Sequence, residues 1–155
     1  MKTIVMIAGI ALLTISSVAV VSAAEVARTA SIVTIDGAAE VSTSANSWAA
    51  AQVGMVLKEG DSIRTKENSM VVLNLDGNGE TATAEMKPNS QMKLQELKTN
   101  KEEGTEKTLL DLALGTILIK AKKLHSERSR FEVKTPTSIV GVKGTTFSVS
   151  VETIE

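Results

Sequence analysis

Cysteine is absent from the 155-residue chain, and other residues that build reactive or ligand-stacking sites are scarce. The sequence has one histidine, His125, no tyrosine, and three aromatic residues, Trp48, Phe131 and Phe147. Without cysteine, the fold depends on packing and backbone hydrogen bonds, and thiolate metal sites and cysteine nucleophiles are excluded. A lone histidine argues against a closed zinc site, so we expect no metal and no cofactor. The shortage of aromatic rings argues against sugar or single-stranded nucleic-acid sites, which stack their ligands on rings.

Basic and acidic residues are nearly balanced in number. The formal net charge is −1, and removal of residues 1–24 would take away one lysine and leave 16 basic and 18 acidic residues. A balance of this kind creates no strong field toward nucleic acid or a membrane surface, so we expect no nucleic-acid partner.

The N-terminus has the pattern of a secretory signal peptide. Lys2 is followed by an uncharged apolar run from Ile4 to Val21 and by small residues before Glu25. This order predicts cleavage after Ala24, or one residue earlier, and export to the periplasm or the outside of the cell. The alternative is an uncleaved membrane anchor, because about 18–20 apolar residues can span a bilayer.

Residues 25–155 have the size of one domain and the pattern of short strands. Apolar and polar residues alternate in runs such as Met70–Asp76 and Phe147–Glu152, and turn signals such as Asp36-Gly37 separate the runs. No stretch with the helical period is long enough to demand a helix. The sequence predicts an all-β domain of short antiparallel strands, of five to seven residues each, arranged as a sandwich, a barrel or a short β-solenoid. The polar stretch 98–107 is expected to be a solvated loop or a long hairpin tip.

The segment TPTSIVGVKGTTFSV, residues 135–149, is rich in glycine and hydroxyl residues. It lacks the glycine spacing of a phosphate-binding loop, and it lies between β-like runs rather than the two helices of an RNA-binding GXXG loop. We therefore interpret Pro136 as a residue that ends strand pairing, and Gly141 and Gly144 as residues that supply special backbone angles or close approaches. The catalytic alternative pairs the Thr145 hydroxyl with Lys143 as its base, and we rank it far below the structural interpretation.

Two carboxylate groupings have structural interpretations too. Glu59 and Asp61 bracket a glycine turn, and we do not expect them to have the buried environment of an acid/base pair. Residues 76–80 resemble the start of a calcium loop but lack its later ligands, so a hairpin tip is favoured.

The basic residues Lys120, Lys122, Lys123, Arg128 and Arg130 form the one local excess of charge. We interpret them first as a solvated edge that discourages strand aggregation. The alternative is a surface that binds an acidic partner or an anionic envelope polymer.

The segment VKTPTSIVGVKGTTFSV, residues 133–149, resembles the FecR domain family, in which a strand, a Thr-Pro pair, a Val-Arg-Gly-Thr-like element and an aromatic strand follow one another. The resemblance continues through WAAAQVGMVLKEGDSIRT, MKPNSQMKLQEL and LDLALGTILIKAKKL, and covers the chain from about Ile32. We predict that the following residues serve the structure first and a possible interaction second: Trp48, Gly60, Asp61, Pro136, Gly141, Lys143, Gly144, Thr145 and Phe147.

Family membership implies an extracytoplasmic all-β domain of bacteria. The best-known members end a membrane-spanning anti-sigma regulator, whereas this chain is similar to the stand-alone exported kind. Lys143 stands where the family usually has arginine, and the sequence stops where the family usually continues through further strands. We expect a non-enzymatic binding or scaffolding module of the cell envelope with a protein or envelope-polymer partner. The alternative function is sensing or signal relay through a membrane partner.

Overall fold

The structure is a computed structural model that describes residues 24–44, 47–76, 82–122 and 126–152. In these residues the chain forms strands and no helix, as predicted. The strands are β1 (Val26–Ala27), β2 (Ala30–Asp36), β3 (Ala39–Ser44), β4 (Ser47–Ala50), β5 (Val56–Leu57), β6 (Ser62–Thr65), β7 (Met70–Asn74), β8 (Ala82–Met86), β9 (Gln91–Asn100), β10 (Thr105–Ala121), β11 (Arg130–Lys134), β12 (Ile139–Val142) and β13 (Thr146–Val151). The predicted signal peptide lies almost wholly outside the described residues.

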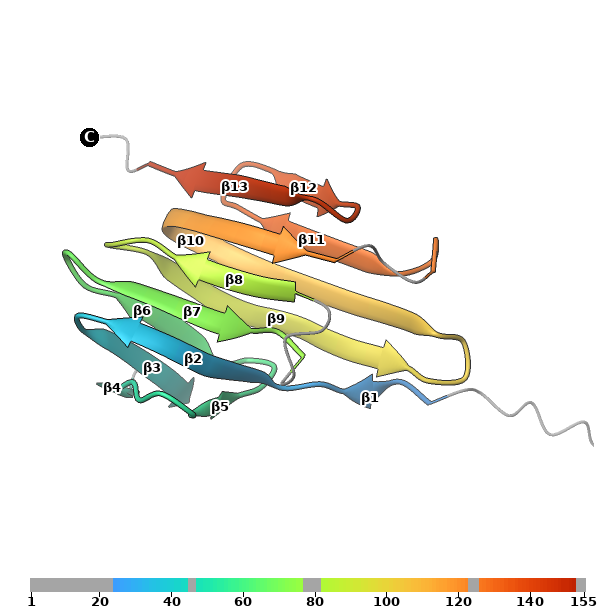
Figure 1. The fold of residues 1–155 in the computed structure, drawn as a ribbon, viewed down its shortest axis with the longest axis horizontal. Helices are drawn as coiled ribbons and strands as arrows, with labels where there is room; N and C mark the ends of the chain where they lie inside the picture. The colour runs from blue at the N-terminus through green and yellow to red at the C-terminus, as the bar shows by residue number, and fades with distance from the viewer. Residues whose placement is uncertain (1–23, 45–46, 77–81, 123–125, 153–155) are drawn as a thin grey trace, which may run out of the picture.

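The strands form a β-sandwich whose two layers share one strand, β10 (Figure 1). The first layer has the order β4-β3-β6-β9-β10-β11-β12, with β1 beside the far half of β9. The second layer has the order β5-β2-β7-β8-β10-β13. The pairs are antiparallel except for β10 and β11, which are parallel. A parallel pair needs a crossover, and here the second half of β10 and the connection after it provide one.

Strand β10 passes from one layer to the other at Gly115. Its first half pairs with β9 and β11, and its second half, from Gly115 onward, pairs with β8 and β13. Gly115 has a φ of +87°, which L side chains rarely adopt. The structure has one bent strand of 17 residues here, and β9 has 10 residues, so the expected length of five to seven residues is wrong for both strands.

Alternation along the strands places one face of each layer in a shared core. In β7 and β8, for example, every second side chain is buried. The largest fully buried side chains come from both layers: Ile32, Leu57, Ile63, Leu73, Leu75, Met86, Met92, Leu94, Leu97, Leu110, Leu112 and Phe131. Each contributes about 1.5–3 kcal/mol by leaving water, which accounts for a cysteine-free fold.

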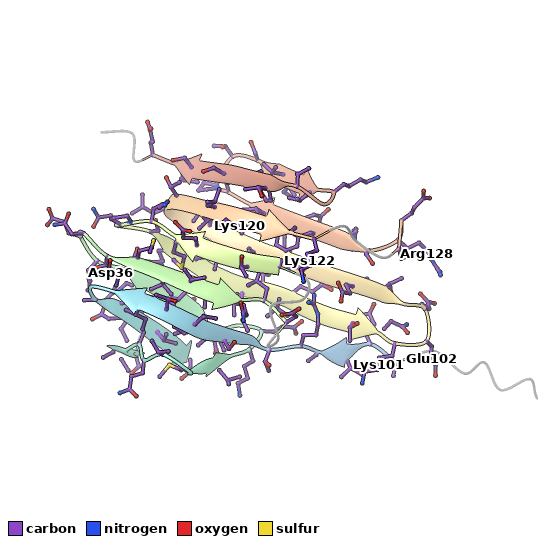
Figure 2. All side chains as sticks on the ribbon, in the orientation of Figure 1. Asp36, Lys101, Glu102, Lys120, Lys122 and Arg128 are labelled. Atoms are coloured by element: carbon purple, nitrogen blue, oxygen red, sulfur yellow. The ribbon has the colours of Figure 1, made fainter. Side chains whose placement is uncertain are left out.

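The stretch 98–107 is half strand and half turn. Strand β9 runs on to Asn100 and β10 begins at Thr105, so the hairpin tip is only residues 101–104. Figure 2 shows Lys101 and Glu102 at this tip. Asn100 caps the turn, since its Oδ1 accepts from the backbone N–H groups of Glu102 and Glu103 at 3.1 Å each. The predicted long hairpin tip is therefore shorter than its polar sequence indicated.

Candidate binding edge at the C-terminal strands

The segment 135–149 forms one open edge of the sandwich, and β4 and β5 end the two layers on the other side. It contains β12, the last strand of the first layer, and most of β13, the last strand of the second layer. Among the described strands, β12 pairs only with β11, and β13 only with β10. Figure 1 shows both strands at the top of the view. The motif noticed in the sequence thus provides two neighbouring free strand edges.

Pro136 begins the tight turn that sets the register of β12. The Thr135 N–H donates to the Ser138 carbonyl at 2.8 Å, and the Ser138 N–H donates to the Thr135 hydroxyl at 3.0 Å. Proline suits the second position of such a turn because its φ is already fixed there. The turn then brings β12 back antiparallel to β11, with Lys134 opposite Ile139.

This register determines which backbone groups of β12 face outward. Thr135 and Ser138 form a hydrogen-bonded pair, and such pairs alternate with non-bonded ones along an antiparallel ladder. Val140 and Val142 therefore bond to β11, whereas the N–H and C=O groups of Ile139 and Gly141 point away from it. The Ile139 side chain is also 64% exposed and that of Val140 37%. The four residues of β12 itself include no charged side chain of the kind that often protects a free strand.

A groove of about 340 Å³ lies at the end of this edge. The groove is lined by the first residues of β11, the last residues of β12 and one residue next to each: Ser129, Arg130, Phe131, Glu132, Gly141, Val142 and Lys143. Phe131 and Val142 are a buried cross-strand pair, whereas Arg130, Gly141 and Lys143 are exposed. The groove therefore combines an apolar boundary with two cations and one carboxylate.

The structure does not support the predicted reason for glycine at position 141, which was a special backbone angle or a close approach. The φ of Gly141 lies outside the left-handed region, and a Cβ built on it meets nothing within 4 Å. The domain's own backbone and packing thus do not require glycine at this position, and the structural prediction is wrong for Gly141. It is right for Gly144, whose φ is +63° in the turn between β12 and β13.

The connection 143–145 meets the end of β10. The Ala121 N–H donates to the Thr145 carbonyl at 3.3 Å, and Lys120 lies opposite Thr146. Figure 2 shows Lys120 and Lys122 at this end of β10. Lys143 therefore lies in a region that contains several members of the predicted basic cluster.

Arg128 separates from the rest of that cluster. Its guanidinium lies 3.5 Å from a carboxylate oxygen of Glu103, at the tip of the β9–β10 hairpin. Figure 2 shows it at the same end of the molecule as Lys101 and Glu102. Lys123 and His125 fall outside the described residues.

Comparison with known proteins identifies the family. The family model described as FecR protein matches residues 61–154, which include the open edge and the groove. The chain belongs to the FecR family. No curated protein and no solved structure matches it. The match begins at Asp61, so it does not include the earlier part of the resemblance, with Trp48 and Gly60.

Gly60 and Asp61 build the turn that enters the matched part of the FecR chain. Gly60 has a φ of +92°, and its N–H donates to the Leu94 carbonyl at 2.8 Å. The Asp61 carboxylate accepts from the Lys58 N–H at 2.9 Å. Asp61 is only 2% exposed, contrary to the expectation that its environment would not be buried. Because its carboxylate closes a backbone turn, the burial serves structure.

Trp48 lies on the outer face of the FecR chain's first layer, half-buried. The Arg64 guanidinium lies 4.1 Å from the centre of its ring, which is a cation–π contact. Glu40 accepts from Arg64 at 2.6 Å and pairs with Lys66 at 2.7 Å. The hydrogen bonds from these two cations, Lys66 foremost, lower the pKa of Glu40 below its ordinary value. Trp48 thus belongs to a surface cluster, whereas Phe131 lies in the core and the partly buried Phe147 packs against it.

The hydroxyl residues of the FecR segment differ in exposure. Thr135 is buried, and its hydroxyl bonds to Ser138 in the turn. Thr145 and Thr146 are exposed, and Ser150 exchanges a hydrogen bond with Thr116 at 2.7 Å. In the part of the chain that the structure describes, no group of three or more metal-ligating side chains forms a possible metal centre. The described residues also contain no helix with the length and apolar character to cross a membrane.

Sequence reasoning missed Arg28, whose side chain joins the two layers. Its guanidinium donates to the Thr108 hydroxyl at 2.7 Å, the Lys107 carbonyl at 3.1 Å, the Lys98 carbonyl at 3.3 Å and the Leu75 carbonyl at 3.5 Å. Burial lowers the pKa of Arg28 below its usual value, against the opposing effect of nearby carboxylates. The only signal in the sequence was a basic residue just before the first strong strand pattern.

Proposed function

We propose that the protein is a non-enzymatic binding module of the bacterial cell envelope and that it binds through the open edge formed by β12 and β13. The supporting observation is the free β12 edge, with two outward backbone positions and an exposed isoleucine beside a groove. An unpaired strand edge presents backbone donors and acceptors that can pair with another chain, and β12 has no charged residue of its own. Export through the N-terminal segment is part of the same proposal.

Membership in the FecR family and the engagement of the conspicuous polar residues support a binding role over catalysis. Glu59 and Asp61 accept hydrogen bonds from the backbone N–H groups of Leu97 and Lys58. Their carboxylates are thus committed to turns. Thr145 and Lys143 are both exposed, without the enclosed surroundings that activate a nucleophile.

Photo-crosslinking in living cells tests this function. A photoreactive phenylalanine at Ile139 in the full-length chain is expected to form an adduct with another envelope component. The same amino acid at Lys101, on the β9–β10 hairpin tip, serves as the control and is expected to form none. Failure to form an adduct at position 139, or equal adducts at both positions, would contradict the proposal.

A signalling role is the second candidate, and the FecR family match is the observation that favours it. In this second candidate, a membrane protein binds the open edge and passes the signal of that binding on. Deletion of the gene is then expected to change transcription of a defined set of genes, and re-expression of an Ile139→Lys variant is expected not to restore it. An unchanged transcript profile would remove this candidate.

A further inference from the structure

The proposed function leaves the chemistry of the partner open, and the β12 edge restricts it. We propose that β12 binds an extended peptide segment as an added strand, and that this segment places a bulky apolar side chain over Gly141 and an acidic side chain beside Lys143. This inference rests on the proposed binding role and specifies its site and ligand class.

The backbone of β12 favours a peptide strand. The outward N–H and C=O groups of Ile139 and Gly141 are two residues apart, which is the spacing of one repeat along a strand. An added strand can bond to both positions without disturbing any bond between β12 and β11. A polysaccharide or polyphosphate chain does not have this regular alternation of donors and acceptors.

Gly141 explains the bulky side chain. It is exposed, lines the groove and has open space where its Cβ would be. Glycine within a strand often marks a place where a ligand or another backbone approaches closely. Since no residue that the structure describes occupies this space, we infer that the feature that benefits from glycine is a partner. A large side chain on an added strand can lie across Gly141 and contact the exposed Ile139 on the same face of β12.

Charge explains the acidic residue. Arg130 and Lys143 line the groove together with one acid, Glu132. Lys120 and Lys122 extend the basic character along the end of β10, next to the 143–145 connection. A carboxylate two residues from the bulky side chain, on the same face of the added strand, would lie beside Lys143.

A second copy of this chain fits the edge less well. Pairing of β12 with another β12 would bring Ile139–Val142 and Lys143 of each copy together, and this segment has no acidic residue. The cations at the groove would then face each other, and like charges placed opposite each other destabilise strand pairs.

Selection and affinity measurements test the proposal. A random-peptide phage library is selected on the purified full-length chain, and labelled selected peptides are measured by fluorescence anisotropy. We expect the selected sequences to share an acidic residue two positions from a bulky apolar one. Gly141→Pro removes one outward N–H group and Lys143→Glu reverses the charge, and each is expected to weaken binding about tenfold or more. Gly141→Ala places a methyl group where the bulky side chain would lie and is also expected to weaken binding. Lys101→Glu is the matched control for the charge reversal and is expected to bind within about twofold of the unmodified chain.

Hydrogen exchange by NMR provides a test that needs no variant. A selected peptide is expected to slow exchange of the Ile139 and Gly141 amides, whereas the Val140 and Val142 amides are protected already by β11. This pattern distinguishes strand addition from contact with side chains alone.

Three outcomes would overturn the inference. Peptides that bind Gly141→Pro and Lys143→Glu as well as the unmodified chain would move the site elsewhere and leave the binding role standing. An Ile139 photo-adduct with a glycan, together with no selected peptide, would make the ligand a polymer. Self-association in sedimentation experiments that Gly141→Pro abolishes would make the partner a second copy. If the proposed function itself is wrong, the photoreactive residue at position 139 forms no adduct of any kind, and this result differs from all three.

Discussion

Gly115 and Ser90 approach so closely that a Cβ on the glycine would lie 2.5 Å from the Ser90 Cα. The contact fixes the corner at which β10 leaves one layer for the other. The Ser90 hydroxyl also accepts from the Thr116 N–H at 2.9 Å and donates to the Thr116 carbonyl at 3.2 Å. One serine therefore holds the backbone on the far side of the corner.

Gly115→Ala is expected to destabilise the domain severely. The methyl group would meet backbone atoms of Ser90, and alanine would be strained at a φ of +87°. Together these effects cost about 3–5 kcal/mol, a large share of the roughly 5–15 kcal/mol by which a domain is typically stable. Urea denaturation followed by circular dichroism measures the change. Gly141→Ala is the matched control and should change the unfolding free energy by less than about 0.5 kcal/mol; equal effects at both positions would refute the corner argument.

Arg28→Lys is expected to cost about 2 kcal/mol, because one ammonium group cannot reach the acceptors that the guanidinium joins. Those acceptors include the Lys98 carbonyl of β9, the Thr108 hydroxyl of β10 and a carbonyl after β7. Arg128→Lys is the same substitution at an exposed ion pair, and is expected to cost less than about 0.5 kcal/mol. Thermal unfolding of the two variants side by side gives the comparison. If they unfold alike, Arg28 does not join the layers.

The strands were predictable wherever their pattern is local. Alternation in Met70–Asp76 and Phe147–Glu152 follows from burial of one face, and β7 and β13 lie in these stretches. Strand β12 carried no such pattern, because Ile139, Val140 and Gly141 are all exposed and a glycine interrupts the apolar run. Only Val142 of β12 is buried, so burial imposes no alternation on this short strand.

The sandwich corner and the edge site depend on distant contacts, which the sequence does not display. Gly115 faces Ser90, 25 positions earlier, and Arg28 reaches acceptors 47 to 80 positions later. The basic residues were visible as a run, but Lys143 joins them only through the turn that follows β12. The role of Gly141 was predicted wrongly, because the sequence does not show whether a glycine is needed for its backbone angle or for the space that a side chain would fill.

Variants of Asp61 test whether its carboxylate acts as a hydrogen-bond acceptor or through its charge. Asp61→Asn keeps an oxygen that can accept from the Lys58 N–H, so it is expected to lose less than about 1 kcal/mol. Asp61→Leu removes the acceptor of the part-buried bond from the Lys58 N–H and is expected to lose more, about 1–2 kcal/mol. Chemical denaturation of both variants provides the measurement. A large loss in Asp61→Asn would show that the charge, and not the hydrogen bond, is required.

The Glu40 cluster should make the stability of the domain sensitive to acid. Hydrogen bonds from Lys66 and Arg64 lower the folded-state pKa of Glu40 below the ordinary value of 4.5. A carboxyl group whose pKa is lowered by folding contributes stability above its unfolded pKa and loses it as pH falls through the folded pKa. The Glu40→Gln variant is therefore expected to be less stable than the unmodified chain at pH 7 and to approach it as the pH falls below 4.5. Denaturation curves across this pH range measure how the unfolding free energy of each of the two chains depends on pH. Glu102→Gln, at the hairpin tip, is the matched control, and a stability difference for Glu40→Gln that stays constant down to low pH would show that its effect is not electrostatic.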